Sequence, residues 1–312
     1  MNIGWILDSG YLPHAVIRTE PTLAAAALER KMAFIEALRA GPMAVETGTA
    51  NAQHYEVGTG VLAAMLDPRM KYSGCLFPEG RETLAQAEAA MLASYVEKAA
   101  LQDGMMAMLP KSKITAFSNS QSQKKYIDDR AQEKGFTNLT VITGDIVDYE
   151  FEANSFDRII SVELFEHMKN YELLMAKVAR ALKPDGKLFV HIFSHKTSPY
   201  NFENDWISTN FFTGGTMPSA DLLLYFQKDL KIERQWWVNG MHYSKTCEHW
   251  LANMIAKKMQ IWPHLEEAYG KENAGMWYNR WQIFHMACSE LFAYQGGDTW
   301  GVSLYLFEKP KP

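Results

Sequence analysis

Three features that define large classes of protein are scarce or absent in this chain. It has only three cysteines in 312 residues, Cys75, Cys247 and Cys288, and these lie far apart without the short spacing of metal ligands. We therefore expect reduced thiols, with no disulfide framework and no metal site. No apolar run approaches the ~20 residues of a membrane span, and the N-terminal residues lack the basic region and apolar core of a signal peptide. These absences favour a cytoplasmic protein without stable membrane insertion.

A basic surface is also missing. The net charge is -5 at pH 7 and the pI is about 6.0, and no local block of lysine and arginine compensates for this. A nucleic-acid partner is therefore disfavoured. With 47% hydrophobic residues, the chain is long enough for one large domain with an appended segment. The sequence does not decide between a monomer and a homodimer.

The first third of the chain reads as helical. Apolar residues at helical spacing predict helices over residues 21–39 and 83–101, which end at Gly41-Pro42 and Asp103-Gly104. No interdomain linker is evident. We expect a helical extension on the substrate side over residues 1–82 and one larger domain over residues 83–312.

The larger domain alternates between strand-like and helix-like segments. The predicted strands cover residues 113–118, 139–144, 156–162, 186–193, 230–238 and 301–307, and the predicted helices cover 121–134, 171–182 and stretches around 248–258 and 276–292. A turn is predicted at Lys183-Pro-Asp-Gly186. This alternation is typical of an α/β fold, in which helices cover both faces of a largely parallel sheet.

The segment SVELFEHM, residues 161–168, carries the candidate chemistry. The buried strand at 156–162 ends here, so Glu163, Glu166 and His167 emerge at its carboxyl end, where ligands bind in open α/β sheets. The alternative is that these residues only begin the next helix, since acidic residues are common in a first helical turn. On spacing alone the two interpretations have about even odds.

Seven local motifs, taken together, carry a family resemblance. They are QHYEV at 53–57, MKYS at 70–73, ITAFSNS at 114–120 with Gln123, SVELFEHM at 161–168, GKLFVH at 186–191, FFTGGTMPS at 211–219 and WWVNG at 236–240. From about Ala44 to the C-terminus the chain resembles the coclaurine N-methyltransferase-like proteins. These belong to a wider group that contains the cyclopropane-fatty-acid synthases. Each motif alone is weak, and the set is specific.

The resemblance implies a Rossmann-like class I methyltransferase sheet and S-adenosylmethionine as cofactor. It implies catalytic roles for Glu163, Glu166 and His167. The cofactor-binding residues that it implies are Tyr72 and Ser73 at the carboxylate end, Asn119 and Gln123 near the nucleoside, and Asp145 and Ile146 beside the adenine. The aromatic residues expected to form a wall for a small amine are Tyr55, Phe212, Trp236, Trp237 and Tyr243. Ordinary core packing is the alternative for these aromatics.

One feature that the resemblance implies is missing. A first strand, a glycine-rich loop and a helix should follow Asp103-Gly-Met105. The chain instead passes through Met106-Ala-Met-Leu-Pro110 directly to the strand at 113–118. Five residues cannot hold a strand of ~5 residues, a tight turn and several helical turns. We therefore expect the first strand and the glycine loop to be deleted and S-adenosylmethionine to bind weakly.

Three functions remain open. The first is N-methyl transfer to a small amine, with Glu166 and His167 accepting the proton. The second is methylene transfer to a lipid, as in the cyclopropane synthases, with bicarbonate held by Glu166, His191 and a cysteine. Methylene transfer to a lipid is disfavoured because Gly74 occupies the position of this cysteine, and Cys75 is one residue further along the sequence. The third is a catalytically inactive paralogue that acts as a binding protein.

Overall fold

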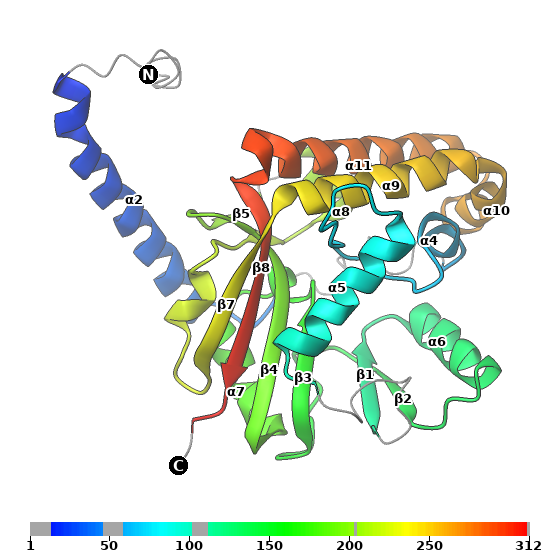
Figure 1. Ribbon diagram of the computed structural model, residues 1–312, viewed down its shortest axis with the longest axis horizontal. Helices are drawn as coiled ribbons and strands as arrows, with labels where there is room; N and C mark the ends of the chain where they lie inside the picture. Colours follow the sequence, from blue (N-terminus) through cyan, green and yellow to red (C-terminus); the bar gives the residue numbers. More distant parts are fainter. Residues whose placement is uncertain (1–13, 46–58, 102–111, 203–204, 311–312) are drawn as a thin grey trace.

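A four-stranded sheet with the order β3-β4-β8-β7 forms the centre of the fold (Figure 1). The computed structural model describes residues 14–45, 59–101, 112–202 and 205–310. The strands are β3 (Phe156–Val162), β4 (Leu182–His195), β7 (Lys231–Asn239) and β8 (Trp300–Glu308). β3 and β4 are parallel, whereas β8 runs antiparallel to both β4 and β7. The carboxyl ends of β3 and β4 therefore lie at the same edge of the sheet.

Successive side chains of β4 point to opposite faces of the sheet, so the hydrophobic core has one part on each face. On β4, Phe189 and Phe193 belong to one hydrophobic cluster, and Leu188, Val190 and Ile192 belong to the other. The first cluster is shared with α5 (Leu84–Lys98), and the second with α2 (His14–Ala40) and α7 (Tyr171–Ala181). Because strand side chains point alternately to opposite faces, this pattern requires a helical layer on each side.

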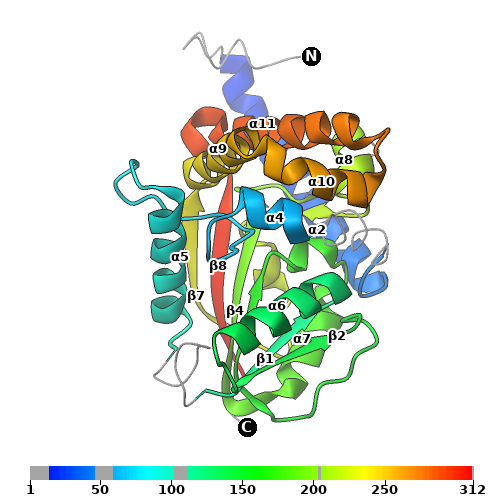
Figure 2. The same cartoon turned by 90° about the vertical axis from the view of Figure 1, so that its right-hand side faces the viewer.

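A group of helices lies across the carboxyl ends of β3 and β4 (Figures 1 and 2). It consists of α4 (Thr59–Met65), α8 (Trp206–Phe211), α9 (Gly240–Ala256), α10 (Lys258–Tyr269) and α11 (Ala274–Gly297). Helix α9 begins at Gly240, where a Cβ would collide with the carbonyl oxygens of Phe292 and Trp300. Only glycine permits this close approach, which packs α9 beside α11 and above the sheet.

The remaining elements are short. A two-stranded parallel sheet joins β1 (Ile114–Ser118) to β2 (Leu139–Thr143), with α6 (Gln121–Glu133) packed beside it. Ser120 caps α6 by accepting a hydrogen bond from the Gln123 N–H. Two further strands, β5 (Tyr200–Asn201) and β6 (Thr216–Met217), pair with each other, and η1 (Phe165–His167) and η2 (Leu222–Tyr225) are single 3-10 turns.

The strands and helices predicted from the sequence lie within a few residues of the observed ones, with four differences. The helix predicted over 21–39 begins earlier, at His14, and the helix predicted around 248–258 begins earlier, at Gly240. Helices α4, α8 and α10 were not predicted. The predicted turn at 183–186 lies inside β4. There the register advances from Leu182 to Lys187 while the partner strand advances only from Phe156 to Arg158. Residues 183–186 therefore form a bulge in the strand rather than a turn between two elements.

The sheet is divided at the position where the first strand was expected to be deleted. Within the described residues, β1 pairs only with β2 and β3 pairs only with β4, so two strand edges stay without a partner strand. The packing there is incomplete. All five residues of β1 are partly exposed, and Ile160 in the middle of β3 is 41% exposed. A missing central strand and its helix account for both observations.

We expect the divided sheet to show in hydrogen exchange. Amide hydrogens of β1 and β2 should exchange about tenfold faster or more than those of β4 and β8, because they lack a strand on one side. Inserting a Val/Leu-rich strand, a Gly-x-Gly turn and a helix between Met105 and Met106 should slow this exchange. It should also restore S-adenosylmethionine binding, measured by calorimetry.

An insertion of equal length made of glycine and serine is the control and should change neither property. Tight binding of S-adenosylmethionine by the unmodified chain would contradict the expected loss. We expect this loss of binding because the glycine loop would supply several hydrogen bonds to charged groups of the cofactor, each worth about 1.5 to 3 kcal/mol.

Candidate active site

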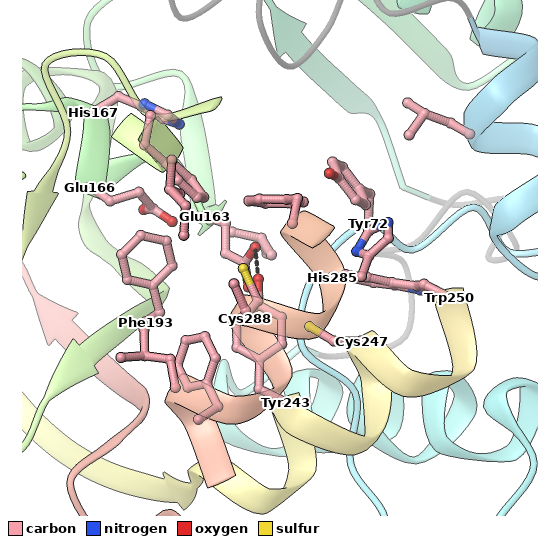
Figure 3. Close-up of a pocket in the computed structure, with 18 of the residues that line it drawn as sticks. Tyr72, Glu163, Glu166, His167, Phe193, Tyr243, Cys247, Trp250, His285 and Cys288 are labelled. Atoms are coloured by element: carbon pink, nitrogen blue, oxygen red, sulfur yellow. Dashed lines mark hydrogen bonds between the residues drawn. The ribbon is translucent and has the colours of Figure 1, made fainter. Parts of the chain in front are cut away.

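Three donors converge on the carboxylate of Glu163 at the end of β3. The Gly74 N–H and Nε2 of His191 lie 3.1 and 3.2 Å from Oε1. The Tyr243 hydroxyl lies 2.8 Å from Oε2 (Figure 3). Glu163 has a φ of 47°, in the left-handed region that non-glycine residues rarely adopt. Backbone strain of this kind is found at functional sites.

The surroundings of Glu163 favour its ionised form. Burial acts to raise its pKa, but the hydrogen bond from His191 and the nearby Lys71 ammonium outweigh burial, and the pKa lies below its usual value. Burial lowers the pKa of His191, so its imidazole is neutral near pH 7. A neutral imidazole facing a carboxylate donates through the nitrogen that carries its proton. The pair is thus a carboxylate and a neutral donor.

Glu166 lies three residues away in a different environment. Its side chain, in η1, is 1% exposed, and neither oxygen has a hydrogen-bond partner among the described residues. Burial, followed by the charge of Glu163, raises the pKa of Glu166 well above its usual value. The environment of Glu166 therefore favours its protonated form, and its unpartnered oxygens face the same cavity as Glu163 (Figure 3).

His167 lies beside Glu166 at the wall of this cavity. Burial lowers the pKa of its imidazole to about 4, and the charge of Glu163 only partly opposes this effect. The ring is therefore neutral at pH 7. Glu163, Glu166 and His167, predicted from one short motif, are brought together at one cavity.

The cavity has a volume of about 550 Å³ and lies between the strand ends and the helices above them. Its wall is largely aromatic. The aromatic residues in the wall are Tyr72, Tyr126, Phe193, Tyr200, Phe202, Phe212, Tyr243, Trp250, Phe284 and Phe292. Four residues predicted for cofactor or substrate therefore face it: Tyr72, Gln123, Phe212 and Tyr243. A cavity of this size and composition suits a small aromatic ligand.

Other predicted cofactor residues do not line the cavity. The Ser73 hydroxyl is buried and accepts a hydrogen bond from Lys71. The Asp145 carboxylate accepts the Val147 N–H at 2.8 Å, which closes a turn after β2. Asn119 follows β1, and Ile146 packs against the core on the α7 face. Their cofactor roles stay predictions.

The structure does not bring all the predicted aromatic residues to the cavity. Trp236 and Trp237 lie on β7, which the strand order places at the opposite edge of the sheet from β3. Trp236 instead lies under the ammonium of Lys98 at 5.7 Å from its ring centroid. The predicted wall residue Tyr55 lies outside the described residues.

Sequence reasoning missed two parts of the site. His191 was assigned with Glu166 to a bicarbonate site, but its Nε2 faces Glu163 instead. Tyr95 lies in α5, where the sequence pattern indicates only a buried apolar position, but its hydroxyl lies 2.8 Å from Nδ1 of His191. Nothing in the spacing of α5 reveals this contact, because the partner lies 96 residues away on β4.

Comparison with known proteins identifies the fold. The chain matches the structure of coclaurine N-methyltransferase bound to N-methylheliamine and SAH with a TM-score of 0.85 and 34% identity, covering 97% of this chain and 98% of that one. The cyclopropane synthase MmaA2 from Mycobacterium tuberculosis shares the fold at a TM-score of 0.70 and 19% identity, covering 86% and 100% of the two chains. The fold and site are those of a class I, S-adenosylmethionine-dependent methyltransferase.

Sequence comparison places the chain within this class. The model of the mycolic acid cyclopropane synthetase family matches residues 45–110 and 111–301, and the chain belongs to this family. It is 36% identical to (S)-coclaurine N-methyltransferase of Thalictrum flavum subsp. glaucum, over 87% of this chain and 82% of the relative. It is 27% identical to cyclopropane-fatty-acyl-phospholipid synthase of Escherichia coli K12, over 80% and 66% of the two chains.

The comparisons also locate the deletion. The two matched segments of the family model meet between Pro110 and Lys111, inside the interval where the glycine loop was expected. The alignment with the Thalictrum enzyme spans 296 positions but includes 87% of this chain, or about 271 of its 312 residues. At least about 25 positions of that relative therefore have no counterpart here.

The described residues fit only part of S-adenosylmethionine. Tyr72 and Gln123 face the cavity, and the carboxyl ends of β1 and β2 are present for the nucleoside end. The strand that should carry the glycine loop has no counterpart in the described sheet between β1 and β3. The described residues therefore show no backbone cradle for the amino-acid end, and they do not fit the whole cofactor.

The described residues contain neither a membrane-spanning helix nor a cluster of metal ligands. None of the described helices is long and apolar enough to cross a membrane. Among the described side chains, no group of three or more His, Cys, Asp or Glu could hold a metal ion. A cytoplasmic location and a homodimer stay predictions from the sequence.

We expect His167 to make the protein acid-sensitive. Its pKa is about 4 in the folded state against 6.5 in the unfolded chain, so the unfolded state binds the proton first as pH falls. Between pH 6.5 and 4 this lowers the free energy of unfolding by about 1.4 kcal/mol per pH unit. Denaturant titrations should therefore show a shallower acid loss for His167→Gln than for the wild type.

The contribution of Glu166 cancels in this comparison, because both proteins retain it. The exposed histidine His264 provides the matched control, and His264→Gln should follow the wild-type pH profile. Equal acid profiles for His167→Gln and the wild type would show that the imidazole is not buried.

Proposed function

We propose that the cavity binds a small aromatic amine and that the site is built for N-methylation of this amine, with weak cofactor binding in this chain. One observation carries the proposal. Glu163 and Glu166, one ionised and one protonated, face the same aromatic cavity together with the neutral imidazole of His167. This arrangement suits a ligand that carries a proton on nitrogen and must release it.

Aromatic rings and a carboxylate together favour an amine over a neutral ligand. Phe193 and Phe212 on one side and Trp250 on the other expose ring faces or edges to the cavity. Attraction between a cation and a ring contributes about 0.5 to 2 kcal/mol per good contact. The Glu163 carboxylate adds an opposite charge in a buried setting, where the attraction is stronger than in water.

Proton removal follows from the environment of Glu166. Burial disfavours charge, so an uncharged pair of carboxylic acid and free amine is favoured over a carboxylate and an ammonium. An amine that shares the cavity with Glu166 therefore exposes its nitrogen lone pair. His167, neutral at pH 7, can accept a proton directly or through water. S-adenosylmethionine, when bound, supplies the methyl group.

The arrangement around Glu163 argues against the lipid alternative. A bicarbonate ion needs hydrogen-bond donors, and the Gly74 N–H, His191 and Tyr243 all donate to the Glu163 carboxylate instead. Gly74 itself stands where the resemblance implies a cysteine. Both observations support the amine over the lipid.

The divided sheet supports a second candidate function, a binding protein with little turnover. The cavity wall comes from the ends of β3 and β4, from α4, α8, α9 and α11, and from Gln123, Tyr126 and Ile127 of α6. None of these elements belongs to the expected deletion. We therefore expect this chain to bind an amine in the cavity even though it binds the cofactor weakly. The two candidates differ only in whether any methyl transfer follows binding.

We expect Glu166→Gln and His167→Ala to lower methyl transfer by about 10² to 10⁴ in the form of the protein that carries the inserted strand and glycine loop. His167→Ala removes the proton acceptor, and Glu166→Gln removes the carboxyl group whose environment favours the neutral amine. Cofactor binding should change little, which calorimetry with S-adenosylmethionine tests separately. Glu172→Gln, on an exposed part of α7, is the control and should keep the parent rate. Full turnover in both variants would mean that the assigned roles are wrong.

We expect the unmodified chain to bind benzylamine or tetrahydroisoquinoline in calorimetry and to ignore dispersed phospholipid. Phe212→Leu should weaken amine binding by about 0.5 to 2 kcal/mol, because the ring in the cavity wall is lost. Trp236→Leu, on β7 away from the cavity, is the matched control and should not. Labelled methyl groups found in a lipid fraction, with none on amines, would reverse the assignment.

A further inference from the structure

A buried lysine, Lys71, lies near the Glu163 carboxylate but does not line the cavity. Lys71 is 7% exposed, and its Nζ lies 3.0 Å from the Ser73 carbonyl, 2.7 Å from the Ser73 Oγ and 2.5 Å from the Gly74 carbonyl. Burial lowers the pKa of Lys71, and the nearby Cys75 and Glu163 oppose this effect. In its ammonium form the group has three donors and no acceptor, so these three contacts use all of its protons. The ammonium also lies 5.7 Å from the ring centroid of Tyr95.

The contacts of Lys71 fix the direction of the next hydrogen bonds. Because Lys71 donates to the Ser73 Oγ, the hydroxyl proton of Ser73 is available to a further acceptor. Burial raises the pKa of Tyr95, and the Ser73 hydroxyl opposes this effect, as a proton donor to the Tyr95 oxygen does. Tyr95 in turn lies 2.8 Å from Nδ1 of His191. With its oxygen accepting from Ser73, Tyr95 donates its own proton to Nδ1.

The last hydrogen bond in this series, between His191 and Glu163, requires the same direction of proton donation. Nε2 of His191 lies 3.2 Å from Oε1 of Glu163, and a carboxylate can only accept. The imidazole proton must therefore be on Nε2, which leaves Nδ1 as the acceptor that Tyr95 requires. A donor-only group at one end and an acceptor-only group at the other allow a single arrangement of the protons between them.

We propose that Lys71, Ser73 and Tyr95 are positioning residues that fix His191 as its Nε2–H tautomer and so hold the Glu163 carboxylate at the cavity wall. Without the Tyr95 hydroxyl, the other tautomer becomes accessible and presents a lone pair to Glu163. The Gly74 peptide strengthens the coupling, because its carbonyl accepts from Lys71 while its N–H donates to Glu163. The inference rests on the proposed function only in assigning Glu163 to the amine.

The test uses the full chain and needs no turnover. Long-range nitrogen–proton NMR spectra report which imidazole nitrogen carries the proton, and His191→Gln identifies the His191 signals among the nine histidines. We expect Nε2 to be protonated and Nδ1 unprotonated in the wild type. In Tyr95→Phe the two His191 nitrogen shifts should move towards each other, as two tautomers exchange, and benzylamine affinity should fall about tenfold.

Ser73→Ala is a second variant, which interrupts the relay without touching His191 and should shift the His191 signals in the same direction. The matched control is Tyr305→Phe. Tyr305 is also a buried tyrosine, and its hydroxyl donates to the Ala220 carbonyl at 2.7 Å, but it packs in the cluster on the α7 face of the sheet. This variant should keep the wild-type His191 spectrum and benzylamine affinity.

The outcomes separate the two proposals. A His191 proton on Nδ1 in the wild type, or wild-type His191 spectra in both Tyr95→Phe and Ser73→Ala, would overturn the relay. A changed tautomer with unchanged benzylamine affinity would support the relay and overturn the assignment of Glu163 to the amine.

Discussion

The carboxylate of Glu163 joins the parts of the chain that make the site. Its hydrogen bonds reach the loop at Gly74, strand β4 at His191 and helix α9 at Tyr243, which lie 89, 28 and 80 residues away in sequence. The left-handed backbone at Glu163 turns the chain out of β3 at the point where these groups meet. Strain at one residue is offset by three charge-assisted hydrogen bonds, which are stronger than neutral ones.

Two carboxyl groups three residues apart hold different charges because their surroundings differ. Glu163 receives donors on both oxygens and keeps its charge, whereas Glu166 has none among the described residues and keeps its proton. The charge of Glu163 itself raises the pKa of Glu166. Environments that separate two pKa values in this way are characteristic of acid–base sites. The pair thus offers an anion and a protonated carboxyl group to one ligand.

The sequence predicted local structure and short motifs well and long-range contacts poorly. The strands and the cluster at 163–167 follow from periodicity and from the end of one strand, which are local properties. Neither the contact of Tyr95 with His191 nor the position of Trp236 and Trp237 at the far edge of the sheet could be predicted. Both depend on strand order and on helix packing. The deletion was visible because chain length alone excludes a strand and a helix in five residues.

The deletion separates two parts of the site that this fold usually builds on one continuous sheet. Cofactor contacts at the amino-acid end depend on the missing strand, whereas the cavity depends on β3, β4 and the helices above them. Those elements share a core in which Phe189 and Phe193 of β4 pack with α5, α9 and α11. This core is closed without the deleted segment, while β1, β2 and α6 have few buried side chains. The amine cavity and its carboxylate therefore depend mainly on elements outside the expected deletion.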